Sequence, residues 1–125
     1  MKNEALICLA KEAMKQAYAP YSNFQVGAAL LSADGAVYTG CNVENASYSA
    51  GCCAERTALF KAVSEGARDF VKIAVVSADK KPAYPCGICR QVLSEFGQDI
   101  TVVVEEDGKA VEYRLSNLLP HQFVL

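Results

Sequence analysis

The chain has 125 residues and a mass of 13.4 kDa. This length is typical of one globular unit, and we expect residues 1–125 to form a single domain. An apolar fraction of 52% with a charged fraction of 21% is not the composition of a disordered chain. A net charge of −2 argues against a nucleic-acid polymer as partner, and no apolar run is long enough to cross a membrane.

The N-terminal segment bears on where the protein works. Residues 1–17 carry charges every few positions and lack the uninterrupted apolar stretch of a signal peptide. We therefore expect a cytoplasmic protein.

Hydrophobic periodicity and turn residues predict eight elements and a final helical turn. Asn3 is the predicted N-cap of the first helix, and Gly66 and Gly97 are expected to end the second and third helices. In chain order, the predicted elements are a helix over 4–17, strands over 26–31 and 37–43, a helix over 53–65, a strand over 71–78, a helix over 87–96, strands over 100–104 and 111–115, and a helical turn over 116–119.

The order of these elements predicts a mixed sheet. Helices between the second, third and fourth strands imply right-handed crossovers between parallel strands. Asp34-Gly35 and Asp107-Gly108 are typical of tight turns in antiparallel hairpins. We expect an α/β fold: a three-layer α/β/α sandwich with a mixed five-stranded sheet whose last two strands are antiparallel.

Six cysteines are the most informative residues of the chain. A reducing cytosol disfavours disulfides, and the spacing carries more information than the count. Cys86 and Cys89 form a C-x-x-C pair, which is typical of metal ligands or of a redox pair. A redox pair would be expected after an early strand, and here a helix and two strands come first, which favours a metal.

Three of the cysteines are predicted to meet at the starts of two helices. Cys53 begins the second helix, and Cys86 and Cys89 begin the third. Both helices follow a strand and a loop, so their N-termini should lie at one edge of the sheet, where α/β proteins bind ligands. Helix N-termini favour thiolates, the form that binds zinc.

The number of ligands distinguishes a catalytic zinc site from a structural one. Three protein ligands leave one position for water or substrate, whereas closed structural sites have four. We predict one Zn²⁺ held by Cys53, Cys86 and Cys89. A fourth ligand would have to come from a set of four other residues: Cys8, Cys41, Cys52 and His121.

Glu55 is the candidate catalytic residue. It lies two positions after Cys53, where both side chains can reach the space ahead of the helix. A carboxylate in a first helical turn is usually a favourable dipole contact. Beside a metal ligand, it can also accept a proton from water and pass it on.

These residues resemble a known family. Cys53-Ala54-Glu55, followed by Pro85-Cys86-Gly87-Ile88-Cys89, resembles the signature of the zinc-dependent nucleoside and nucleobase deaminases. Further segments resemble the small cytidine deaminases nearly end to end: Ala19-Pro20-Tyr21-Ser22, Phe24-Gln25-Val26-Gly27-Ala28-Ala29-Leu30, Gly40-Cys41-Asn42-Val43-Glu44-Asn45-Ala46, Cys53-Ala54-Glu55-Arg56-Thr57-Ala58, Cys86-Gly87-Ile88-Cys89-Arg90-Gln91-Val92 and Leu118-Leu119-Pro120.

The resemblance implies a reaction and an assembly. It implies conversion of cytidine and 2′-deoxycytidine to uridine and 2′-deoxyuridine, with release of ammonia, in pyrimidine salvage. A water activated by zinc would attack C4 of the base while Glu55 shuttles protons. It also implies a homotetramer with pockets shared between chains.

The resemblance further implies a set of substrate-binding residues. Asn42 and Glu44 alternate on one face of a predicted strand, so both can reach one ligand. Without the resemblance, they would fit an exposed polar edge, and Phe24 would fit the core equally well. The implied set is Phe24 for stacking on the base, Asn42, Val43 and Glu44 for the ribose, Ala54 and Tyr48 in the pocket, and Phe123 reaching the pocket of a neighbouring subunit.

Charge balance points to one more residue. Three thiolates with Zn²⁺ carry a formal charge of −1, which opposes the ionisation of water. Two helix N-termini supply some compensation. Arg56, next to Glu55, is the best side chain to hydrogen-bond the sulfurs, although arginine on a helix is usually solvated. Arg90 is a weaker candidate for the same role.

Three alternatives remain open on the sequence. The first is a deaminase of the same fold that acts on another substrate, such as tRNA adenosine, guanine or a nucleoside antibiotic. The turn at Asp107-Gly108 and the acidic pI disfavour an RNA substrate. The second is a zinc-stapled binding module without catalysis, and the third is a redox dithiol protein.

Overall fold

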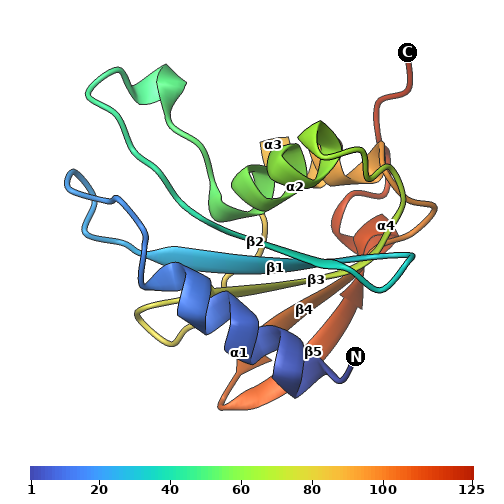
Figure 1. Cartoon of the computed structure of the whole chain (residues 1–125), viewed down its shortest axis with the longest axis horizontal. Coiled ribbons are helices and arrows are strands. Elements are labelled where there is room, and N and C mark those ends of the chain that lie inside the picture. Colours follow the sequence, from blue (N-terminus) through green and yellow to red (C-terminus); the bar gives the residue numbers. More distant parts are fainter.

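The computed structural model describes the whole chain, residues 1–125 (Figure 1). The predicted order of helices and strands is confirmed, with one short 3₁₀ helix in addition. In chain order the elements are α1 (Asn3–Met14), β1 (Val26–Ser32), β2 (Val37–Cys41), the 3₁₀ helix η1 (Tyr48–Ala50), α2 (Ala54–Ser64), β3 (Phe70–Ser77), α3 (Gly87–Ser94), β4 (Thr101–Glu106), β5 (Lys109–Arg114) and α4 (Leu115–Leu118).

The five strands form one mixed sheet in the order β2-β1-β3-β4-β5. β1 is antiparallel to both β2 and β3, β3 is parallel to β4, and β4 is antiparallel to β5. The β4–β5 turn places Asp107 at φ 51° and Gly108 at φ 77°, and positive φ at both positions is typical of a tight hairpin turn. The predicted antiparallel end of the sheet is therefore confirmed. β2 and β3 run in the same direction, as predicted, but β1 lies between them.

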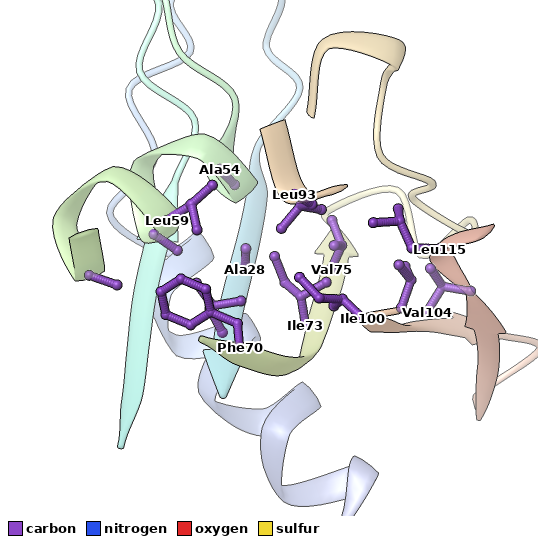
Figure 2. Packing of buried hydrophobic residues seen from close by; sticks show 14 residues of the cluster. Ala28, Ala54, Leu59, Phe70, Ile73, Val75, Leu93, Ile100, Val104 and Leu115 are labelled. Atoms are coloured by element: carbon purple, nitrogen blue, oxygen red, sulfur yellow. The ribbon is translucent and has the colours of Figure 1, made fainter. Parts of the chain in front are cut away.

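The strands direct alternate side chains into two apolar layers. On one face, α1 covers the sheet, and Leu6 packs in a buried cluster with Ala29 of β1. On the other face lie α2 and α3 (Figure 1). Figure 2 shows Leu59 of α2 and Leu93 of α3 with the buried side chains of this second layer. The predicted three-layer α/β/α sandwich is confirmed.

The first helix differs from the prediction at both ends. It ends at Met14 and not at residue 17, because the Tyr18 N–H donates to the Asn42 carbonyl at 3.0 Å and draws the chain toward β2. Lys2 takes the N-cap position predicted for Asn3. The Asn3 side chain instead joins α1 to the sheet by donating to Glu112 at 2.7 Å.

Of the two glycines predicted to end α2 and α3, one does so and the other does not. Gly66 follows α2 with φ at +102°, the left-handed conformation expected of a helix stop. α3 ends earlier than predicted, at Ser94, because the Phe96 carbonyl accepts a hydrogen bond from the Phe70 N–H at 3.0 Å. Gly97 is therefore not the stop. A Cβ on Gly97 would lie 2.7 Å from the Phe70 carbonyl oxygen, so this glycine allows a close approach to β3.

The strand directions decide where the two central helices begin. β2 and β3 are both antiparallel to β1, so their C-terminal ends lie at the same edge of the sheet. α2 begins after the loop that follows β2, and α3 begins after the loop that follows β3. The start of α2 is held close to β2 at Gly40, where a Cβ would lie 2.5 Å from the Ala58 backbone nitrogen.

None of the helices is long and apolar enough to cross a membrane.

Candidate metal centre and active-site pocket

Three cysteines meet where α2 and α3 begin. Cys53 is the N-cap residue of α2, Cys86 is the N-cap residue of α3, and Cys89 lies in the first turn of α3. Their sulfur atoms all lie within 4.8 Å of one another. The Cys86 sulfur also accepts a hydrogen bond from the Cys89 N–H at 3.5 Å, which orients it at the helix end. The predicted ligands are thus brought together.

The cluster has the dimensions of a zinc site. With Zn–S bonds of about 2.3 Å and tetrahedral angles, two ligand sulfurs should lie about 3.8 Å apart. Sγ of Cys53 and Sγ of Cys86 are 3.9 Å apart. None of Cys8, Cys41, Cys52 and His121 joins the cluster. Three thiols without a fourth protein ligand suit one zinc ion in a catalytic arrangement.

The pKa values of Cys53 and Cys89 shift in opposite directions. The Cys89 thiol donates to the Cys53 sulfur, and this bond, with help from Arg56, lowers the pKa of Cys53 to about 5. The same hydrogen bond, together with burial, raises the pKa of Cys89. Cys53, at the positive end of α2, is therefore the more acidic thiol of the two.

Arg56 lies against this thiolate. Its Nη2 donates to the Cys53 sulfur at 3.4 Å, and this contact raises the pKa of the guanidinium. Its Nε is buried and has no hydrogen-bond partner within the chain. A half-buried cation with a spare donor suits a sulfur-rich, negatively charged centre. Arg90 does not take part: it donates to the carbonyls of Pro85 and Leu118, at 2.7 and 2.8 Å.

Glu55 is buried in the first turn of α2. It is 4% exposed, and this burial, reinforced by the nearby Cys53 thiolate, raises the pKa of its carboxyl to about 7. A carboxyl with this pKa can both accept and release a proton near neutral pH. Its place beside the cysteine cluster gives it access to any group bound there.

A pocket of about 440 Å³ is lined by Glu55 together with Cys53 and Cys86. We call it the Glu55 pocket. Its volume lies within the range of small-molecule sites. Phe24, which is 41% exposed, lines this pocket, so it is not a plain core residue. The lining comprises Phe24, Val26, Asn42, Cys53, Ala54, Glu55, Val75, Pro82, Ala83, Tyr84 and Cys86.

A second pocket, of about 470 Å³, adjoins the first and shares Asn42 and Cys53 with it. We call it the Tyr48 pocket. The segment that contains η1 and the loop before β1 project from the same end of the sheet and form its walls (Figure 1). Its lining comprises Tyr21, Ser22, Asn42, Val43, Glu44, Asn45, Tyr48, Gly51, Cys52, Cys53 and Arg56.

The sequence predicted a strand over 37–43, with Asn42 and Glu44 alternating on one face. In the structure both residues lie beyond the end of β2. β2 ends at Cys41, and only Val43 continues the pairing, through single bridges to Tyr18 and Cys52. The bridge to Tyr18 is the tertiary contact that also shortens α1. Asn42 and Glu44 still point in a common direction, since both bind the loop that precedes β1.

Both side chains are anchored by this loop. Asn42 accepts from the Val26 N–H at 2.9 Å and donates to the Phe24 carbonyl at 2.7 Å. Glu44 accepts from the N–H groups of Tyr21 and Ser22 at 3.0 and 3.1 Å, and from the Ser22 hydroxyl. These bonds, led by the Ser22 hydroxyl, lower the pKa of Glu44 and hold its carboxylate at the pocket.

The two outermost predicted residues are not enclosed by their own chain. Tyr48 is 82% exposed and touches the ring of Tyr21 edge to face, with centroids 6.1 Å apart. Phe123 is 68% exposed and lines neither pocket. Its backbone is bound by Gln91 of α3.

Sequence reasoning missed several residues that line the pockets. Pro82, Ala83 and Tyr84 line the Glu55 pocket from the loop before Cys86, and Tyr21 and Ser22 line the Tyr48 pocket. The only signal for the first group was its position directly before the C-x-x-C pair. The second group lay within a segment that resembles the family, without a chemical reason to single it out.

Comparisons with known proteins agree with this centre. The family model described as the zinc-binding region of cytidine and deoxycytidylate deaminases matches residues 1–105. The cytidine deaminase of Sporosarcina psychrophila is 50% identical over 98% of this chain and 92% of its own length, and that of Halalkalibacterium halodurans is 54% identical over 98% and 95%. A crystal structure of cytidine deaminase from Burkholderia pseudomallei superposes with a TM-score of 0.92, at 51% identity, over 98% of this chain and all of that one.

The matches cover the three cysteines, Glu55 and both pockets, since each spans nearly all of the chain. The geometry and the comparisons therefore support the same chemistry, a hydrolytic deamination at a zinc site. This chain belongs to the cytidine deaminases, which are zinc-dependent enzymes.

Proposed function

We propose that the enzyme hydrolyses cytidine and 2′-deoxycytidine to uridine and 2′-deoxyuridine, with release of ammonia, and that it serves pyrimidine salvage. One observation carries the proposal: a buried carboxyl, that of Glu55, lines the same pocket as Cys53 and Cys86 of the three-cysteine cluster. Other nucleosides or bases are the main alternative substrates. An RNA substrate, such as tRNA adenosine, is the weaker alternative, because the chain is acidic and its last two strands form an antiparallel hairpin.

Cys53, Cys86 and Cys89 would hold the zinc ion. When bound, zinc makes water nucleophilic near neutral pH, which is the chemistry that attack on C4 of the base requires. Glu55 accepts the proton of the attacking water and delivers it to ring N3. It then helps to protonate the amino group, which leaves as ammonia, so that one water is consumed for each base converted.

The Glu55 pocket is proposed to take the base. Phe24 presents an apolar ring for stacking, and the buried Ala54, which also lines the pocket, lies between Cys53 and Glu55 in the chain. This arrangement would hold the reacting carbon near Glu55.

Asn42, Val43 and Glu44 are proposed to bind the ribose at the join of the two pockets. Their hydrogen bonds to the chain leave capacity for a ligand. Asn42 retains one N–H and one lone pair on its amide, and a carboxylate accepts about four hydrogen bonds, of which Glu44 uses three. An anchored amide and carboxylate suit a pair of sugar hydroxyls.

The assembly is proposed to be a homotetramer with shared pockets. Tyr48 and Phe123 are large aromatic residues that their own chain leaves exposed. Aromatic rings are enriched in surfaces that a partner covers. In this arrangement, Phe123 of one chain would reach the pocket of its neighbour. A cytoplasmic location stays a prediction.

The test is ultraviolet monitoring of cytidine and 2′-deoxycytidine with the purified enzyme, before and after removal of zinc. Glu55→Gln should lower kcat by about 10²- to 10⁴-fold and keep its zinc, because only the proton carrier is lost. Glu65→Gln, at the exposed end of the same helix, is the matched control and should keep wild-type rates. Full activity in Glu55→Gln would remove Glu55 from the mechanism.

The same experiment separates the alternatives. Zinc bound at one ion per chain, without ammonia release from either nucleoside, would favour a deaminase of another substrate or a zinc-stapled binding module. A protein purified without zinc whose Cys86 and Cys89 form a reversible disulfide would favour the redox alternative.

A further inference from the structure

The loop between β3 and α3 has few anchors of its own. It supplies Cys86 and contributes Pro82, Ala83 and Tyr84 to the Glu55 pocket. Residues 82–85 make no hydrogen bond to another backbone group. Two of these four residues are prolines, which lack an N–H. The order of this pocket wall must therefore come from side chains.

Each end of the loop is tied by a side chain. Near β3, the Ser77 hydroxyl bonds to Asp79 at 2.6 Å and to the Lys81 carbonyl at 3.0 Å. Near α3, Arg90 Nε donates to the Pro85 carbonyl at 2.7 Å. Between these ties, the side chain of Tyr84 reaches out of the loop to the β4–β5 hairpin.

The hairpin holds Tyr84 in two ways. The Tyr84 hydroxyl donates to Oε2 of Glu106, at the end of β4, at 2.8 Å. Its ring packs edge to face on Tyr113 of β5, with centroids 5.6 Å apart and planes at 80°. The Tyr113 hydroxyl donates to the same Oε2 atom of Glu106. The two phenols lower the pKa of Glu106, so the acceptor stays ionised, and bonds to an ionised acceptor are the stronger kind.

We propose that Tyr84 is a positioning residue for nucleoside binding, which fixes the 82–85 wall of the Glu55 pocket through its hydrogen bond to Glu106 on the β4–β5 hairpin. This inference rests on the proposed function of the pocket. Tyr84 acts through the wall and does no chemistry. An anchored wall is ordered before the substrate arrives, so binding does not have to order it.

Tyr84→Phe is the direct test, because it removes the hydroxyl and keeps the ring on Tyr113. KM for cytidine should rise about threefold to tenfold, in line with the loss of one hydrogen bond. Zinc should stay at one ion per chain, and kcat should stay within about twofold of wild type. An unchanged KM would overturn the proposal.

Tyr113→Phe is the matched control. It removes a hydroxyl from the same carboxylate but leaves the loop attached, so its KM should equal that of wild type. A general weakening of the hairpin would instead raise KM equally in both variants, and this result would also overturn the proposal. Glu106→Ala should raise KM for cytidine as much as Tyr84→Phe does. The double variant that combines these two substitutions should have no higher a KM than either single variant.

Trypsin gives a readout that does not depend on activity. Cleavage after Lys80, which lies in the same loop, should be faster in Tyr84→Phe than in Tyr113→Phe or wild type, as identified by fragment mass. Equal cleavage in all three would overturn the anchoring step. If wild type releases no ammonia from cytidine, the proposed function fails, while the cleavage rates still decide whether Tyr84 anchors the loop.

Discussion

Gln91 of α3 binds both backbone polar groups of Phe123, 32 positions further along the chain. Its Nε2 donates to the Phe123 carbonyl at 2.9 Å, and its Oε1 accepts from the Phe123 N–H at 3.0 Å. Gln91 lies two residues after Cys89, so the helix that carries two of the metal ligands also holds the C-terminal tail. The Phe123 ring is left exposed, in a fixed place.

The contact between Gln91 and Phe123 leads us to expect a larger loss of activity from substitution of Phe123 than from substitution of Gln91. Phe123→Ala should lower kcat/KM for cytidine about tenfold, because the ring that we propose to reach a neighbouring pocket is lost. Gln91→Ala should lower it about threefold, because the ring remains but is no longer held in place. Steady-state kinetics with zinc analysis measures both effects. Val124→Ala, also at an exposed position, is the control, and an equal loss in that variant would mean that the tail acts without Phe123 in particular.

The metal ligands predict a coupling between zinc and folding. Cys86→Ala should lose zinc and lower the free energy of unfolding by about 4 kcal/mol or more, the stabilisation that a ligand gives at about a thousand times its Kd. Zinc content and thermal unfolding with and without chelator measure the two effects. Cys52→Ala is the control: it removes a thiol that is next to Cys53 but lies outside the cluster, and it should leave zinc content and stability unchanged. Zinc retained in Cys86→Ala would show that the ligand set is wrong.

Substitution of Arg56 should lower activity without loss of zinc. Arg56→Ala removes the cation that donates to the Cys53 thiolate, so negative charge at the centre should oppose the ionisation of water. We expect kcat to fall about 10- to 100-fold, as for other residues that support metal ligands, with zinc still bound. Arg114→Ala, which removes an exposed arginine on β5, should leave kcat unchanged. If Arg56→Ala had a wild-type rate, the helix N-termini alone would compensate the negative charge of the three thiolates.

The metal centre could be predicted from the sequence because its signals are local. The C-x-x-C pair at Cys86 and Cys89 places two ligands in one helical turn, and the Cys53-Ala54-Glu55 segment places a ligand and a carboxyl at another helix start. The directions of β2 and β3 then bring the two helix ends together. Each of these steps follows from spacing and element order.

The walls of the pockets could not be predicted in the same way. Glu44 binds the backbone of Tyr21 and Ser22, and Tyr84 binds Glu106, each across 22 or 23 positions. No periodicity or turn signal relates residues at such distances. The same kind of tertiary contact, between Tyr18 and Asn42, ended α1 before the predicted residue.

Gly40 lets α2 lie close against β2, and we expect this close approach to position Cys53 in the metal centre. A Cβ at this position would lie 2.5 Å from the Ala58 nitrogen and 2.7 Å from the Ala54 carbonyl oxygen, and neither backbone atom can move without shifting α2. Gly40→Ala should therefore lower the free energy of unfolding by about 1–3 kcal/mol, the usual cost of overpacking.

The same substitution should also weaken zinc binding, because Cys53 is the N-cap of the displaced helix. Chemical denaturation and competition with a zinc chelator measure the two effects. Gly87→Ala is the matched control: it lies beside Cys86 in the first turn of α3, with no atom within 4 Å of its added Cβ. It should be as stable as wild type or gain up to about 1 kcal/mol, because alanine favours the helix. If Gly40→Ala bound zinc and unfolded like Gly87→Ala, the close contact between β2 and α2 would not be what positions Cys53.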